Sequence, residues 1–188
     1  MTRKLLKQEI RQALWEDCVH FHGHACGGLA IGFQAAFLAA EKLSVNFSQD
    51  EELVCISEND ACGVDAIQLL LGCSAGKGNL LFHLRGKQAF TFYERQGRTG
   101  IRLLLKPLPP LLRSERETYL LSRQPSDQFT VMPPRLKLPE TARLFDNLTC
   151  SGCQETTAEP FVRLRQGQPF CLDCCLPLKK LQFLEETE

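Results

Sequence analysis

Four cysteines near the carboxyl end have the spacing of a metal site. Two Cys-x-x-Cys pairs, Cys150 with Cys153 and Cys171 with Cys174, are separated by 17 residues. Zn²⁺ favours four thiolates at tetrahedral corners, and a two-residue gap lets one tight turn present two sulfurs to a single ion. We therefore predict a zinc ribbon whose folding depends on the metal, with Gly152 supplying a positive φ in the first turn. Two redox-active pairs are the alternative, but no thioredoxin-like pattern surrounds them.

A second group of ligand-type residues lies near the amino end. His20, His22, His24 and Cys26 fall within seven residues. In an extended segment alternate residues share a face, so the four side chains would converge, and imidazole and thiolate are ligands that Zn²⁺, Ni²⁺ and related ions accept. Cys26 also stands where a buried helix is expected to begin, and a helix amino terminus favours the thiolate. We predict a metal or catalytic site here, and ordinary surface or core residues are the alternative.

Three further residues are candidates for the same site. Cys62 lies in the first turn of another expected helix and Cys73 just past its end, about 16 Å away at the helical rise, so both cannot bind one ion. Lys77 stands in a glycine-rich turn, GCSAGKGNL, which fails the phosphate-loop pattern. Its charged side chain either faces an anionic substrate or is only the solvated side chain of a tight turn. Cys18 and Cys55 are interpreted as inert buried thiols, and Cys175 as a competing ligand or a spare thiol.

The elements that must position these residues alternate between helical and extended patterns. Helical patterns cover 10–20, 29–43 and 61–71, and extended patterns cover 52–57, 80–85, 89–95 and 101–106. The alanine-rich second helix is apolar nearly all round, which indicates a buried helix, and Asp60 is expected to cap the third. The last three extended runs alternate with period two and are predicted to form an antiparallel meander. This order predicts an α+β fold with helices packed on one face of an antiparallel sheet.

Proline separates the two cysteine groups. Seven of the ten prolines lie between Lys106 and Glu140, around one helical candidate at 114–124. Because proline removes backbone donors and restricts the preceding residue, we predict a connector there and not a second core. The expected domains are an α+β core over 1–145, with this connector at its end, and a small zinc ribbon over 146–188 with a hairpin across Gln166–Gly167.

Composition and charge narrow the function classes. The 188 residues carry 22 Lys+Arg against 22 Asp+Glu, which argues against a protein that binds nucleic acid or anionic membrane through overall charge. No run of 18 apolar residues and no secretory signal pattern is present, so we expect no membrane association and a cytoplasmic location. From Asp146 onward the sequence has four basic and seven acidic residues, a net charge of −3. The ribbon is therefore expected to contact protein, with nucleic acid unlikely as its partner.

Three motifs, in this order, resemble a known family. HGHACGGLAIG, ENDACGVDAIQLLLGCSAGKGNL and GKQAFTFYER resemble the E-subunit family of formylmethanofuran dehydrogenase, the FmdE family. The cysteine-rich tail is similar to the zinc ribbon that many of its members carry. One departure is Gly27, where the family motif usually has proline, which would rigidify the first helical position.

The resemblance implies an α+β core, a C-terminal zinc finger and frequently a homodimer. It also implies a candidate site made of His22, His24, Cys26, Cys62, Asp65 and Cys73. The namesake complex reduces carbon dioxide onto methanofuran with a molybdenum or tungsten cofactor, and many members are free-standing. Family membership therefore fixes the fold better than the reaction.

Two main hypotheses follow. The first is a metal-dependent protein that acts on a one-carbon or pterin-like anionic substrate in molybdopterin-linked redox metabolism, with zinc in the ribbon and a second transition metal in the core. Its catalytic residues are expected to be Cys26, His24, Cys62 and Lys77, its cofactor-binding residue Asp65, and its core metal ligands His22, His24, Cys26 and Cys73. The second is a non-catalytic assembly or scaffold subunit whose ribbon docks a protein partner or, swapped along the connector, the mate in a homodimer.

Overall fold

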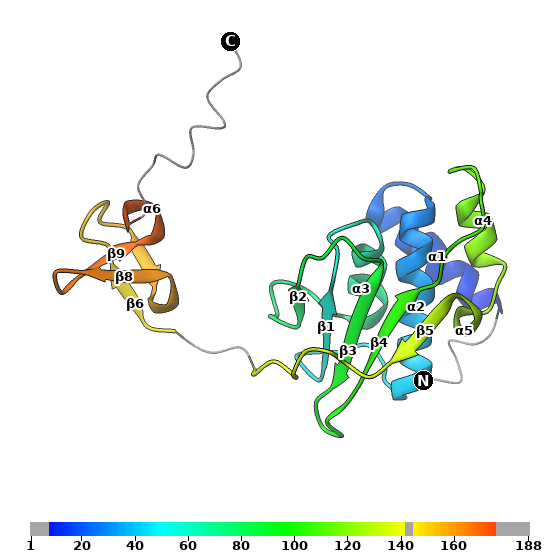
Figure 1. Ribbon diagram of the computed structural model, residues 1–188, viewed down its shortest axis with the longest axis horizontal. Coiled ribbons are helices and arrows are strands. Elements are labelled where there is room, and N and C mark those ends of the chain that lie inside the picture. Colours follow the sequence, from blue (N-terminus) through cyan, green and yellow to red (C-terminus); the bar gives the residue numbers. More distant parts are fainter. Residues whose placement is uncertain (1–7, 142–144, 176–188) are drawn as a thin grey trace, which may run out of the picture. The chain divides into compact units, whose positions relative to one another are not determined.

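The chain divides into two compact units, Met1–Ala142 and Arg143–Glu188. The computed structural model describes residues 8–141 and 145–175. The helices of the first unit are α1 (Gln8–His22), α2 (Gly27–Leu43), α3 (Gly63–Leu71), α4 (Arg116–Leu121) and α5 (Pro125–Gln128). Its strands are β1 (Leu53–Ser57), β2 (Leu80–Phe82), β3 (Ala89–Glu94), β4 (Thr99–Leu105) and β5 (Phe129–Met132) (Figure 1). None of the described helices is both long and apolar enough to span a membrane.

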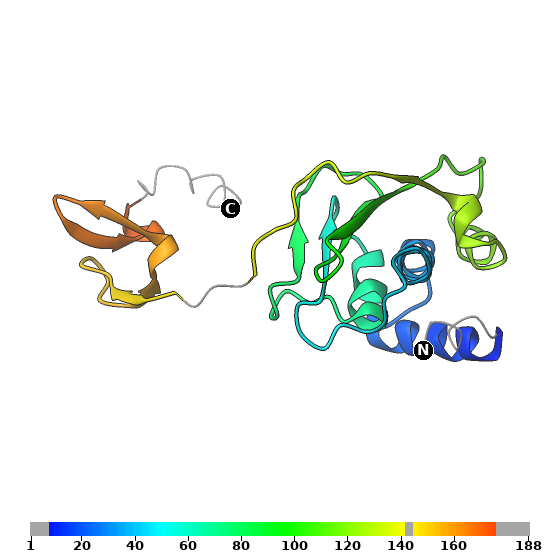
Figure 2. The ribbon, with the colours of Figure 1, turned by 90° about the horizontal axis from the view of Figure 1, so that it is seen from below.

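The five strands form one sheet in the order β2-β1-β3-β4-β5, and helices α1, α2 and α3 lie on the same side of it (Figure 2). This confirms the predicted α+β fold of helices on a largely antiparallel sheet. The predicted meander is wrong for one strand, because β2 pairs in parallel with β1, with Cys55 opposite Leu80. Parallel neighbours need a crossover connection, and α3 provides it.

Helix α2 occupies the centre of the first unit, as its apolar sequence predicts. Twelve consecutive residues, from Leu29 to Ala40, are buried. Helix α3 packs on α2 with backbone close to backbone, since a Cβ placed on Gly32 would lie 1.9 Å from the Gly63 carbonyl oxygen. The expected cap at Asp60 is wrong. Asn59 instead accepts a hydrogen bond from the Ala61 N–H at 3.1 Å through its side chain, and the helix begins at Gly63, after Cys62.

The proline-rich segment belongs to the core, which corrects its interpretation as a connector. It contributes α4, α5 and the fifth strand β5, and Leu120 and Phe129 are buried. After β5 the chain crosses the face of the sheet that α1 to α3 leave open, where Leu136 packs near Tyr93 and accepts a hydrogen bond from its hydroxyl. Prolines here shape loops between short elements, so a high proline content did not exclude a contribution to the core.

The second unit is built from two hairpins and a short helix. Its elements are β6 (Asn147–Thr149), β7 (Thr156–Ala158), a 3-10 turn η1 (Glu159–Phe161), β8 (Val162–Arg165), β9 (Gln168–Cys171) and α6 (Leu172–Cys175). The predicted hairpin across Gln166–Gly167 is confirmed, with Arg165 opposite Gln168. Both turn residues have positive φ, 51° and 80°, which is the pattern of a type I′ turn.

Candidate metal sites in the core and in the ribbon

The four ribbon cysteines come together as the sequence predicts. The sulfurs of Cys150, Cys153, Cys171 and Cys174 all lie within 4.8 Å of one another. The first pair follows β6, while the second spans the junction where β9 passes into α6. This donor set, four thiols from two Cys-x-x-Cys pairs, is the one that structural zinc sites use, and the cluster fits a zinc ribbon.

Backbone N–H groups surround these sulfurs. The Cys171 N–H donates to the Cys150 sulfur at 3.2 Å, and the Gly152 N–H donates to it at 3.4 Å. Backbone hydrogen bonds, that from Cys171 foremost, lower the pKa of Cys150 to about 6, whereas hydrogen bonding to Cys171 raises the pKa of Cys174 to about 12. The pKa values of these neighbouring thiols are thus shifted in opposite directions, and a bound cation would favour the thiolate form of all four.

Gly152 has a different role from the one expected. The positive φ of this turn is at Gln154, at 64°, while Gly152 is needed for space, because a Cβ there would lie 2.9 Å from the Cys174 sulfur. Cys175 does not belong to the group of four. It follows Cys174 on α6, and one residue along a helix turns the side chain by about 100°, away from its neighbour's direction.

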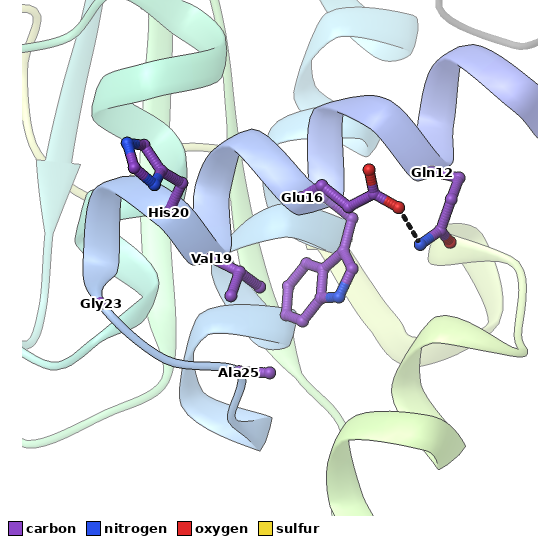
Figure 3. A pocket seen from close by; sticks show the side chains of 7 residues that line it. Gln12, Glu16, Val19, His20, Gly23 and Ala25 are labelled. Atoms are coloured by element: carbon purple, nitrogen blue, oxygen red, sulfur yellow. Dashed lines mark hydrogen bonds between the residues drawn. The ribbon is translucent and has the colours of Figure 1, made fainter.

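The amino-terminal histidines are divided between two faces of α1. The helix continues to His22, so the expectation of an extended segment is wrong, and Gly23, with φ of 94°, ends it. Two residues along a helix correspond to a rotation of about 200°, which places His20 and His22 on opposite sides. His20 instead borders a hollow of about 590 Å³ beside Trp15 and Glu16 (Figure 3). It takes no part in the core site.

The remaining three residues form a second group. Ligand atoms of His22, His24 and Cys26 lie within 4.8 Å of one another, and the two imidazole centroids are 4.5 Å apart. In the described part of the chain, this trio and the ribbon cysteines are the groups of three or more such residues that could hold an ion. The spacing of the motif predicted this convergence, although the turn at Gly23 produces it in place of an extended strand.

His22 is oriented by an acidic partner on α3. Its Nδ1 lies 2.7 Å from Asp65 Oδ2, and the Gln68 amide donates to the other Asp65 oxygen at 3.2 Å. The side chain of His22 is only 12% exposed, and its buried Nε2 has no hydrogen-bond partner among the described residues. A buried imidazole with one nitrogen held by a carboxylate and the other unpartnered is arranged as histidine ligands of metals are.

The two cysteines at the starts of α2 and α3 are neighbours. Cys26 caps α2, its sulfur accepting a hydrogen bond from the Leu29 N–H at 3.3 Å. Cys62 stands at the corresponding position of α3, and both sulfurs border Gly28. Burial raises the pKa of the Cys62 thiol, and the adjacent Cys26 raises it further. The structure therefore brings Cys62, and not Cys73, to the trio.

His24, Cys26 and Cys62 line a cavity of about 880 Å³. The family described as "FmdE, Molybdenum formylmethanofuran dehydrogenase operon" matches residues 21–133, more than half of the chain. The chain belongs to the FmdE family. The matched residues include the whole trio, Asp65 and Cys62, whereas the ribbon lies outside them. The sequence resemblance to this family is thereby confirmed.

Two relatives illustrate how far the likeness extends. A solved structure, that of a tungsten formylmethanofuran dehydrogenase FmdE-like protein from Syntrophus aciditrophicus, superposes with a TM-score of 0.67 at 25% identity, covering 88% of this chain and 91% of that one. A probable S-adenosyl-L-methionine-binding protein from Archaeoglobus fulgidus is 27% identical over 187 residues, covering 82% of this chain. The match takes up 50% of that protein, so the chain spans about half its length.

Two residues expected at the FmdE core site lie elsewhere. Cys73 is fully buried, its thiol faces the Leu53 carbonyl at 3.7 Å, and burial raises its pKa to about 12. Lys77 donates to the Ser48 carbonyl at 2.8 Å and lies 5.5 Å from the Phe47 ring centre. Helix α3 separates both from the trio, because Cys62 and Asp65 are at its amino end while these residues follow its carboxyl end. Cys73 and Lys77 are therefore removed from the proposed core site.

The cavity contains residues that the sequence did not single out. Arg113, just before α4, and Arg116, its first residue, lie on its wall together with Glu117. They were missed because the proline-rich segment was interpreted as a connector. The signal that could have identified them was the apolar pattern of 116–121, which folds the segment back over the start of α2.

Proposed function

We propose that this FmdE protein is a metal-dependent enzyme with two metal centres: a structural zinc in the ribbon and a reactive transition metal held by His22, His24 and Cys26. The observation that carries the second centre is the buried, unpartnered Nε2 of His22 beside two further donors. An unpartnered polar atom costs free energy on burial, and a metal ion would satisfy it.

Three protein donors suit a reactive centre better than a structural one. Structural zinc sites use four protein ligands, whereas catalytic sites use three and leave a position for water or substrate. An ion bound here would supply Lewis acidity, or activate a water molecule. The chain's own residues supply the rest: Asp65 fixes the His22 ring, the start of α2 holds Cys26, and Cys62 places a second thiol beside Cys26.

The reaction class we propose is one-carbon chemistry linked to molybdopterin redox metabolism, in the cytoplasm. The support is the family description and the name of the Syntrophus protein, both of which refer to formylmethanofuran dehydrogenase. The Archaeoglobus relative adds S-adenosyl-L-methionine as a candidate ligand. Titration calorimetry of the full chain with that compound is expected to give saturable heat, and its absence would remove this candidate ligand alone.

The second metal centre is tested by counting ions. We expect inductively coupled plasma mass spectrometry to find two metal ions per wild-type chain and one in the double variant His24→Ala, Cys26→Ser. His20→Ala is the matched control, because this histidine lies in the same segment but outside the trio, and it should retain two. One ion in all three proteins would rule out the second centre.

A second candidate role is docking through the ribbon, as a scaffold or assembly subunit. It is favoured by the exposure of two apolar side chains close in the ribbon sequence, Phe161 (55%) and Leu164 (72%), since exposed apolar side chains that gather in a patch mark contact surfaces. We propose that this surface binds the mate in a homodimer, with or without exchange of the ribbon, or a protein partner. Light scattering should give a dimer mass for the wild type and a monomer for Phe161→Ser, Leu164→Ser, with Arg163→Gln as the control. A monomeric wild type would exclude the homodimer.

A further inference from the structure

The cavity beside the trio has walls of three different kinds. His24, Cys26 and Cys62 form the reactive wall, and Arg113 and Arg116 form a cationic one. Apolar side chains complete the lining: Ile31, Leu105, Leu108 and Leu120. At about 880 Å³ the cavity is within the size range of small-molecule sites, which combine apolar walls with a few polar groups that fix orientation.

The two arginines have no partner of their own. Neither guanidinium makes a hydrogen bond, an ion pair or a ring contact with any residue in 8–141 or 145–175. Both side chains are exposed, whereas two less exposed arginines of the same unit are engaged: Arg102 pairs with Glu58 at 2.5 Å, and Arg95 with Glu51 at 3.2 Å. One carboxylate, Glu117, also lines the cavity, so its lining keeps a net positive charge.

The departure at Gly27 bears directly on where Arg116 lies. A Cβ added to Gly27 would come within 2.8 Å of the Arg116 Cβ. The proline usual in the family motif would therefore push the start of α4 away. Glycine at this position lets Arg116 approach the start of α2, one residue from Cys26.

We propose that this cavity binds a small organic anion, whose carboxylate or phosphate is held by Arg113 and Arg116 while its apolar part packs against Ile31 and Leu120. Guanidinium groups suit both head groups because they donate two parallel hydrogen bonds. The charge recognition expected of Lys77 from the sequence is thus assigned to these arginines. The reaction of the bound anion rests on the proposed function, but its selection by charge does not require the second metal.

The test uses two alkylating probes of nearly equal shape. Iodoacetate and iodoacetamide both alkylate sulfur through their methylene carbon, with a new S–C bond formed and iodide released, but only iodoacetate carries a carboxylate. Alkylation of Cys62 in the full chain is followed by peptide mass spectrometry. We expect the ratio of the iodoacetate rate to the iodoacetamide rate to fall roughly tenfold in Arg113→Gln, Arg116→Gln, because a cationic cleft raises the local concentration of anions. The iodoacetamide rate should stay unchanged.

Matched variants keep the test specific. Arg85→Gln removes an exposed arginine whose guanidinium, among the residues that the structure describes, donates only to its neighbour's carbonyl, and it should leave the ratio unchanged. Arg113→Lys, Arg116→Lys keeps the charge and should retain part of the preference. Circular dichroism of each variant checks that the fold is intact, and the single variants replace the double one if it is not. A ratio in the folded arginine variants within twofold of the wild type would overturn the proposal.

Two competitors distinguish the possible head groups. Protection of Cys62 from iodoacetate by acetate assigns a carboxylate, and protection by inorganic phosphate assigns a phosphate. Small fragments bind weakly, so each competitor is added at about 50-fold excess over the probe. If neither protects Cys62, the proposal is contradicted. Metal content is measured on the same samples. If the wild type contains one ion and the arginine substitutions still lower the rate ratio roughly tenfold, the second metal centre is rejected and the anion site is kept. If it contains two ions and the ratio does not change, the anion site is rejected and the second metal centre is kept.

Discussion

The ribbon and the core gather the same ligand types by different means. In the ribbon, four sulfurs come from two short sequence motifs, and among its described residues only Cys150 and Cys171 are buried. In the core, three donors lie at the junction of α1 and α2, and a large apolar cluster packs around these helices. We infer that metal binding drives the folding of the ribbon, whereas the fold of the core positions the three residues of its proposed metal site.

The largest expected effect follows from that contrast. Removing the ribbon metal with a chelator, or replacing Cys153 with serine, should unfold the second unit, because binding in zinc-finger peptides contributes about 10–16 kcal/mol. The first unit should keep its amide protection in hydrogen exchange. Cys175→Ser is the control, and its second unit should show the same amide protection as that of the wild type. A second unit that stays protected without metal would break the comparison.

The next effect should be confined to the core. Arg102 is 1% exposed and binds Glu58 through two nitrogens, at 2.5 and 2.9 Å. Glu58→Gln leaves a buried guanidinium without its counter-charge, so the free energy of unfolding should fall by about 3–5 kcal/mol. Denaturant unfolding measures this. Glu41→Gln, which removes an exposed partner of Lys42, should change it by less than about 0.5 kcal/mol.

The ion pair of Arg102 and Glu58 should also make the stability of the core depend on pH in the acid range. The hydrogen bond from Arg102 lowers the pKa of Glu58 below its ordinary 4.5, so its stabilisation is fully present above that pH and is lost as pH falls through the lowered value. The free energy of unfolding of the wild-type core should therefore fall more steeply with decreasing pH in this acid range. The Glu58→Gln core should lack this part of the pH dependence. If the free energy of unfolding depends on pH in the same way in both proteins, Glu58 is not the source of this pH dependence.

A smaller effect should separate the two metal sites. Asp65→Asn leaves the three donors in place but weakens the contact that fixes His22, so affinity for an ion at the proposed core site should fall about 10–100-fold. Competition with a chromophoric chelator measures both sites, and the ribbon affinity should not change. Asp17→Asn on α1 is the control. Equal affinities in the variant and the wild type would mean that Asp65 does not position His22.

The smallest expected effect is a gain in the ribbon. Type I′ turns favour Asn-Gly, and Gln166 holds φ of 51° ahead of Gly167. Gln166→Asn should stabilise the metal-bound ribbon by about 0.5 kcal/mol, seen as slower loss of metal to a chelator. Gln168→Asn, in the extended strand β9, should give no gain. A loss of stability in Gln166→Asn would exclude a type I′ turn in solution.

The local features were the ones that sequence reasoning could reach. The ribbon cysteines, the Gln166–Gly167 turn and the burial of α2 depend on residues near one another in the chain, and all three were predicted. Cys62, by contrast, meets Cys26 across 36 positions, and no local pattern indicates which of Cys62 and Cys73 does so. The resemblance to FmdE supplied Asp65, but only the three-dimensional structure pairs it with His22.

The errors have physical causes of the same kind. His20 was grouped with the trio because an extended strand and a helix differ in period, and the choice depended on whether the chain turned at Gly23 or earlier. Lys77 was assigned to the core pocket by its neighbours in sequence, although α3 holds the two apart. Arg113 and Arg116 were missed because their role comes from α4 folding back onto α2, a contact that the prolines around it did not reveal.

The contact of Gly32 with Gly63 has a consequence for reactivity. With no side chain at either residue, α2 and α3 approach until peptide groups touch, and each carries a sulfur at its amino end, Cys26 and Cys62. The spacing of these two thiols is therefore set by bare backbone. A methyl group added at Gly32 would force the two helices apart and change the distance between the two thiols, although Gly32 itself does not line the cavity.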